Sequence, residues 1–207
     1  MLDSLPALFV LFFSIVLHEY AHGYVAYRLG DTTARDAGRL TLNPLAHVDP
    51  IGTVILPLFL ILTRSSFLFG WAKPVPINPM YFRNPMNGMA LTGAAGPASN
   101  LIVAFAAAVL LRLFGGVLGD GFLGQMLAYG IYINVVLAVF NLMPIPPLDG
   151  SRVILPLVPR EVARFYWQLE PYGMFIVIGL FATGILSAMI RPFIQLFAGA
   201  FFGMAGV

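Results

Sequence analysis

The chain has 207 residues, of which 59% are hydrophobic and only 10% charged, which excludes an ordinary soluble globule and indicates a membrane protein of about four to five transmembrane helices. Cysteine is absent, so disulfides and thiolate metal sites are excluded, and any metal must be bound by histidine and carboxylate. The formal net charge of +2 is too small to indicate a nucleic-acid partner.

The first apolar segment, Leu5 to Leu29, contains the run His18-Glu19-Tyr20-Ala21-His22. Two histidines four positions apart project from one face of a helix, so both imidazoles can bind a single metal ion. The glutamate between them can stand beside that ion and take a proton from bound water. Ionisable residues are costly at membrane depth, so this cluster indicates a functional site, with a buried polar cluster for helix packing as the alternative.

The stretch from residue 30 to 85 is irregular in its pattern. Leu40-Thr41-Leu42 alternates and predicts a short strand, and the proline-rich stretch Trp71–Pro79 predicts an extended edge strand. Between them, Ile51–Leu62 is apolar for only about a dozen residues, which favours a re-entrant segment over a full span. A full span over residues 51–69 stays open as the alternative.

The second half of the chain contains further predicted segments. These are spans at Met86–Leu113, Phe122–Met143 and Tyr172–Ile190, an interfacial amphipathic segment at Val153–Glu170, and an unassigned apolar tail at Phe193–Val207. We therefore expect one integral membrane domain over residues 1–207. Its core would be residues 5–150, and residues 151–207 would add a peripheral amphipathic segment and a C-terminal helix.

Two histidines do not complete a catalytic zinc site, which needs a third protein ligand. The candidates outside the first helix are Asp31, Asp36, His47, Asp49, Asp120, Asp149, Glu161 and Glu170. Only Asp149 follows a proline-broken apolar segment, where irregular backbone is tolerated if it is buried in protein or lines a watery cavity. His47 is the second choice, and it can equally be a loop histidine near Asp49.

Three motifs together resemble the site-2 protease family of intramembrane zinc metalloproteases. They are His18–His22, Gly96-Pro97-Ala98-Ser99-Asn100 and Asn141-Leu142-Met143-Pro144-Ile145-Pro146-Pro147-Leu148-Asp149-Gly150, in the family's order. The stretches Arg39–Pro44 and Trp71–Pro76 are similar to a short prokaryotic branch of the family without PDZ or CBS domains. No motif is matched after about Glu170.

The resemblance implies one zinc ion held by His18, His22 and Asp149, with Glu19 as the catalytic acid/base. It implies hydrolysis of peptide bonds in or near transmembrane segments of membrane-protein substrates, within the lipid bilayer of a prokaryotic cell. The extended stretches would then hold the unwound substrate. For the oxyanion donor, Asn141 is the first choice by its motif position, followed by Asn100 and Asn134, with interhelical hydrogen bonding as the alternative for each.

The number of membrane crossings between His22 and Asp149 gives a further expectation about topology. His22 lies about 26 Å along its helix, near the far membrane face, and Asp149 must reach the same depth. This requires that Ile51–Leu62 does not cross. With the amino terminus outside, the site opens toward the cytoplasm and these basic residues share the cytoplasmic side: Arg28, Arg35, Arg39, Lys73, Arg83, Arg152, Arg160 and Arg164.

Two other functions use the same ligands. A membrane zinc carrier or sensor would need a polar path, and the later predicted spans contain no ladder of acids or histidines. A catalytically inactive binder of transmembrane segments is disfavoured by the intact Glu19. A metalloprotease with a downstream glutamate ligand is disfavoured because Glu161 and Glu170 lie outside any predicted span.

Overall fold

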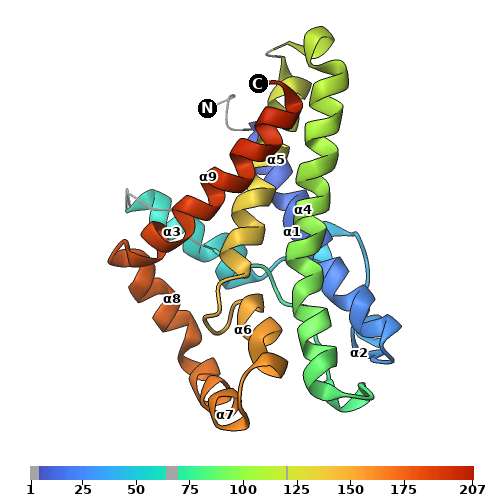
Figure 1. Ribbon diagram of the computed structural model, residues 1–207, viewed down its shortest axis with the longest axis vertical. Helices are drawn as coiled ribbons and strands as arrows, with labels where there is room; N and C mark the ends of the chain where they lie inside the picture. Colours follow the sequence, from blue (N-terminus) through green and yellow to red (C-terminus); the bar gives the residue numbers. More distant parts are fainter. Residues whose placement is uncertain (1–4, 64–69, 120) are drawn as a thin grey trace.

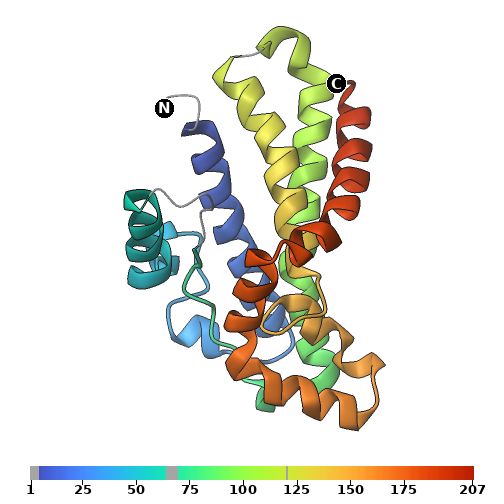
Figure 2. The ribbon, with the colours of Figure 1, turned by 90° about the vertical axis from the view of Figure 1, so that its left-hand side faces the viewer.

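The computed structural model describes residues 5–63, 70–119 and 121–207. Within them, four helices are long and apolar enough to cross a membrane: α1 (Leu5–Arg28), α4 (Pro85–Leu118), α5 (Phe122–Asn141) and α9 (Ile185–Ala205). α1, α4 and α5 pack against one another, and α9 lies against α4 and α5 (Figures 1 and 2). The protein is thus a helical membrane protein, as its composition predicted.

Shorter helical elements connect these four. They are α2 (Thr33–Asp36), η2 (Pro44–His47), the π-helical η3 (Pro50–Ile55), α3 (Leu56–Leu62), η4 (Pro79–Tyr81), α6 (Asp149–Ile154), η5 (Leu155–Leu157), α7 (Arg160–Leu169), η6 (Glu170–Tyr172) and α8 (Gly173–Ala182). α4 begins at a capped turn, where the Asn84 side chain accepts a hydrogen bond from the Asn87 amide and Pro85 occupies the first helical position.

The chain between α1 and α4 leaves and returns at the same end of α1. The Asn78 amide donates to Asp31 Oδ2 at 2.7 Å, which joins the two ends of this connection. The continuous helical run η3–α3, from Pro50 to Leu62, is too short to cross a bilayer, which takes about 20 residues. Residues 64–69, which belong to the stretch 51–69 of the full-span alternative, lie outside the described part of the chain.

The prediction of short β-strands is wrong for the described residues, which contain no strand. Leu40–Leu42 forms a bend and a turn into η2, and residues 71–78, hereafter the strap, run extended without a ladder partner. The physical reason is that several residues of the strap cannot donate a backbone amide to a neighbouring strand. Pro74 and Pro76 have no N–H to donate, and the amides of Val75 and Asn78 donate to the side chains of Glu19 and Asp31.

The predicted last span, Tyr172–Ile190, is also wrong. α8 ends at Ala182, the helix is interrupted at Gly184 with φ of +75°, and α9 then includes the apolar tail up to Ala205. Hydropathy is uniform across this break, so only the left-handed glycine marks it. α9 packs through Leu186 onto a core that also contains Val177 of α8 and Val135 of α5.

Candidate metal centre

A line of polar and small residues joins the three central helices. Each helix presents such residues four positions apart, which places them on one face. This polar seam consists of Ser14, His18 and His22 on α1, Thr92, Gly96 and Asn100 on α4, and Gly130 and Asn134 on α5. All eight are buried, so a row of polar groups runs through an otherwise apolar helix interface.

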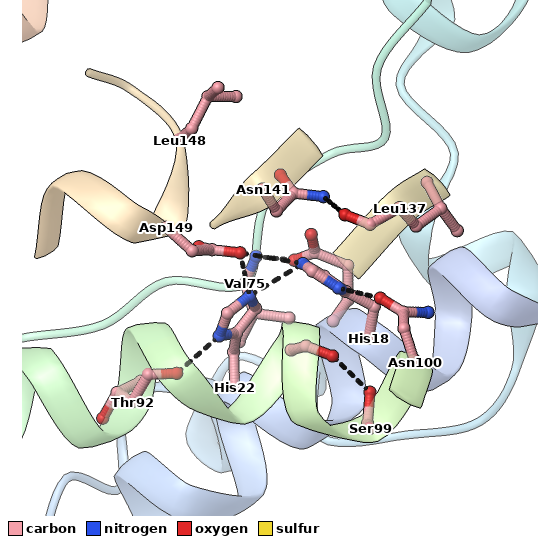
Figure 3. A network of polar contacts seen from close by, with 12 residues as sticks. His18, His22, Val75, Thr92, Ser99, Asn100, Leu137, Asn141, Leu148 and Asp149 are labelled. Atoms are coloured by element: carbon pink, nitrogen blue, oxygen red, sulfur yellow. Dashed lines mark hydrogen bonds and ion pairs between the residues drawn. The ribbon is translucent and has the colours of Figure 1, made fainter. Parts of the chain in front are cut away.

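The seam fixes which nitrogen of each histidine faces the centre. His18 Nδ1 lies 2.6 Å from Asn100 Oδ1, and His22 Nδ1 lies 2.7 Å from the Thr92 carbonyl oxygen (Figure 3). Both partners are acceptors, so each Nδ1 carries the proton and donates it. In the neutral imidazoles, each Nε2 therefore has no proton and offers its lone pair to the centre. The two Nε2 atoms lie 3.0 Å apart.

Asn100 is itself held in the orientation that this requires. Its Nδ2 donates to Asn134 Oδ1 at 2.8 Å, and Asn134 Nδ2 donates to Ser14 Oγ at 2.8 Å. Because the amide nitrogen of Asn100 points to Asn134, its side-chain carbonyl oxygen points to His18. A chain of hydrogen bonds from three helices thus sets the tautomer of one histidine.

Asp149 brings a third acceptor to the same point. Its Oδ2 lies 3.1 Å from His18 Nε2 and 3.2 Å from His22 Nε2, and one ligand atom from each residue lies within 4.8 Å of the other two. This oxygen is buried and has no hydrogen-bond partner among the described residues. One proton can satisfy only one pair of these atoms, whereas a metal ion satisfies all three.

The environment keeps Asp149 ionised. Burial alone would raise the pKa of its carboxyl group, but the imidazoles of His18 and His22, whenever they carry a second proton, hold that pKa below its ordinary value. Two imidazoles and a carboxylate are a ligand set that zinc prefers, and three protein ligands leave a position for water or substrate. The residues therefore fit a catalytic zinc ion.

Close backbone approach makes this convergence possible. A methyl group at Gly96 would collide with the rings of both His18 and His22, so α4 passes directly beneath the imidazoles only because this residue is glycine. A methyl group at Gly150 would collide with the carbonyls of Leu142 and Met143, so Asp149 can begin α6 immediately beside the end of α5. Gly96 of the small-residue motif and Gly150 after the broken span thus both allow the close approach that brings Asp149 to the two histidines.

Glu19 lies next to the centre but outside the ligand set. Its Oε2 accepts a hydrogen bond from the Val75 amide of the strap at 2.9 Å. A cavity of about 210 Å³ is lined by His18, Glu19 and Asn141. It shares lining residues, including Trp71, with an apolar cavity of about 440 Å³ bordered by α1, α5 and α8.

The three asparagines predicted as oxyanion donors lie in different places. Asn141 lines the cavity beside Glu19, with its Nδ2 donating to the Leu137 carbonyl at 2.9 Å. Asn100 and Asn134 are fully buried in the seam, and their amide groups are engaged behind His18. His47, the alternative ligand, donates from Nε2 to the Thr41 carbonyl and is not part of the three-ligand cluster.

Sequence reasoning missed part of this network. The sequence motifs do not identify Ser14, whose hydroxyl accepts a hydrogen bond from Asn134. Thr92 contributes its backbone carbonyl, which no side-chain motif reveals. The available signal was the spacing of four positions that Ser14 shares with His18 and Thr92 with Gly96.

Fold and site together define a helical membrane protein with a buried His-His-Asp cluster that could hold a metal ion, beside an adjacent glutamate. The chain is 42% identical over 201 residues to the Bacillus subtilis protein named "Putative zinc metalloprotease YwhC", covering 94% of this chain and 88% of that protein. It is 32% identical over 194 residues to Rip2 of Mycolicibacterium smegmatis, which bears the same description, covering 94% of this chain and 71% of Rip2.

The chain belongs to this family of zinc metalloproteases. Rip2 of Mycobacterium tuberculosis is 28% identical over 174 residues, covering 84% of this chain and 65% of that protein. No protein-family model and no solved structure matches the chain.

Proposed function

We propose that this protein is an intramembrane zinc endopeptidase of the site-2 protease type, which cuts membrane-protein substrates in or near their transmembrane segments. The observation that carries the proposal is the convergence of His18 Nε2, His22 Nε2 and Asp149 Oδ2 between apolar helices. The centre is buried among segments that can span a bilayer, so a substrate must reach it from the membrane or its surface.

Zinc bound there would supply a Lewis acid for a peptide carbonyl and would lower the pKa of a coordinated water. Glu19 takes a proton at its carboxylate from water in the adjoining cavity and returns it to the leaving amide nitrogen. Asn141, on the same cavity, has a second amide hydrogen with which to bind a developing oxyanion. Asn100 and Asn134 hold His18 in place rather than touching substrate.

The cavities favour an apolar polypeptide as substrate. The larger one, of about 440 Å³, is lined largely by aliphatic and aromatic side chains and adjoins the cavity beside Glu19. A transmembrane helix hides its carbonyls in hydrogen bonds, so it must unwind before it is cut. Ala72 of the strap lines both cavities, where main-chain pairing with an unwound segment would hold it.

The arrangement also supports a site that opens toward the cytoplasm of a prokaryotic cell. Asp149 meets His22 in the C-terminal half of α1, and the connection from Asp31 to Asn78 returns to that same end. With the amino terminus outside, the positive-inside rule places this end in the cytoplasm. A re-entrant position for η3–α3 follows from the same topology.

The test is cleavage by the protein reconstituted in liposomes with transmembrane peptides of varied sequence. We expect cuts within or next to the apolar segment, loss of cutting after chelation, and recovery when zinc is restored. A zinc carrier would instead move zinc across the liposome membrane and cut nothing, and that result would overturn the proposal.

A further inference from the structure

The strap presents a single amide to the metal centre. Pro74 and Pro76 cannot donate hydrogen bonds, so between Lys73 and Ile77 only Val75 has an N–H. That N–H donates to Glu19 Oε2 at 2.9 Å. The Pro-Val-Pro sequence therefore isolates one donor from any regular ladder and directs it to one carboxylate.

Contacts on both sides of Val75 hold the strap in position. The Lys73 amide donates to the His47 carbonyl at 2.9 Å, and Arg39 Nη2 donates to the Lys73 carbonyl at 2.6 Å. On the other side, the Asn78 amide donates to Asp31 Oδ2 at 2.7 Å. The strap is thus fixed two residues before the amide and three residues after it.

Two of these contacts use buried charges. Asp31 is fully buried and Arg39 is 8% exposed, and no ion pair joins either of them to another described residue. Burying a charge without a counter-charge is costly, and here each charge is bonded to the strap's backbone. Arg39 and Asp31 thus hold the strap on both sides of Val75, and Asp31 also accepts hydrogen bonds from Thr33 through its other oxygen, Oδ1.

Val75 also packs closely on α1. Its Cγ1 would lie 3.1 Å from a methyl group placed on Gly23, so the strap rests directly on the helix that carries Glu19. Val75 is buried, and the glycine opposite it is one helical turn from Glu19. Side chain and amide of the same residue thus contact the same helix.

We infer that the Val75 amide is a positioning group for Glu19, and that Arg39 and Asp31 are positioning residues that act on Glu19 through the strap. Anchoring Oε2 leaves Oε1 as the oxygen for proton transfer, and it prevents rotation of the carboxylate. This inference rests on the proposed function for the consequence in catalysis, but the anchoring itself is independent of activity.

The first experiment tests the anchoring without any assay of cleavage. Amide hydrogen exchange is followed on protein labelled with ¹⁵N-valine and ¹⁵N-lysine, with the Val75 resonance identified by its loss in Val75→Pro. In Glu19→Ala, we expect exchange of the Val75 amide to accelerate at least about tenfold, since a buried donor has lost its acceptor. The Lys73 amide should be unchanged because its acceptor is a backbone carbonyl. If the Val75 amide exchanged at the same rate in the wild type and in Glu19→Ala, the inference would be overturned.

The second experiment measures the consequence for catalysis. Val75→Pro removes the N–H and suits a position between two prolines, whereas Val75→Ala keeps the N–H and loses side-chain packing. We expect Val75→Pro to lower kcat about ten- to a hundredfold with KM and bound zinc unchanged, and Val75→Ala to retain most activity. Equal losses in both variants would show a merely structural role. Absence of cleavage by the wild type would count against the proposed function and leave the exchange result standing.

Discussion

The polar seam and the strap both end at the metal centre, but different parts of the chain carry their polar groups. In the seam, side chains on regular helices bond to one another, as Asn100 does to His18 and to Asn134. In the strap, the backbone is bonded and the side chains of Arg39 and Asp31 serve to hold it. Substitutions in the seam should therefore change metal binding, and those that loosen the strap should lower cleavage while leaving metal binding unchanged.

Glu19 stands where the two regions meet, and its substitution should have the largest effect. Glu19→Gln removes the proton acceptor without removing a metal ligand. We expect cleavage to fall by about 10²- to 10⁴-fold, the usual contribution of a general acid/base, while bound zinc stays at the wild-type level. Metal analysis and peptide cleavage on the same preparation check this, and zinc loss would mean that Glu19 is a ligand.

Gly96→Ala tests whether the seam depends on close backbone approach. The added methyl group would meet both imidazoles, so we expect zinc affinity to fall about a hundredfold, with cleavage falling in parallel. Gly199→Ala on α9 is the matched control, because a methyl group there meets nothing within 4 Å. Competition with a zinc chelator measures both affinities, and equal values for the two variants would contradict the close approach.

Asn100→Ala tests the hydrogen-bond chain behind His18. Without the acceptor at Nδ1, the imidazole loses its fixed tautomer and orientation, and we expect zinc affinity to fall about ten- to a hundredfold. Ser99→Ala is the control, since among the described residues Ser99 Oγ bonds to the carbonyl of Gly96 in its own helix and not to His18. If Asn100→Ala lowered cleavage with zinc affinity intact, Asn100 would be an oxyanion donor instead.

Arg39→Gln tests the strap and should have the smallest effect. It weakens the hold on the Lys73 and Pro74 carbonyls, so we expect cleavage to fall several-fold. Zinc affinity should not change, in contrast to the seam variants. Arg35→Gln removes an exposed partner of Asp36 and should leave both properties unchanged. A loss of zinc in Arg39→Gln would end the distinction between the two regions.

The three candidate metal ligands could be predicted from the sequence better than the strap, for a physical reason. Helical periodicity fixes the direction of side chains, so His18 and His22 could be placed on one face, and the broken span singled out Asp149. The Thr92 carbonyl could not be found this way because every residue has one. The prolines of the strap exclude a helix and so predict an edge strand, but they do not indicate which acceptor the remaining Val75 amide bonds to.

The break between α8 and α9 shows a second limit of sequence patterns. Tyr172–Ile190 is uniformly apolar, and the left-handed turn at Gly184 interrupts it within a stretch that hydropathy reads as one span. Packing then decides the outcome, because α9 buries Leu186 and Ala198 against the core while α8 contributes Val177. Local glycine conformation outweighed the length of the apolar run.

The most direct test of the central claim is the zinc content of the detergent-purified protein, wild type beside Asp149→Ala. If His18, His22 and Asp149 form one catalytic zinc site, the wild type holds about one tightly bound zinc per chain and the variant loses most of it. If the variant keeps its zinc at the wild-type level, Asp149 is not a ligand, and the account of the metal centre is wrong.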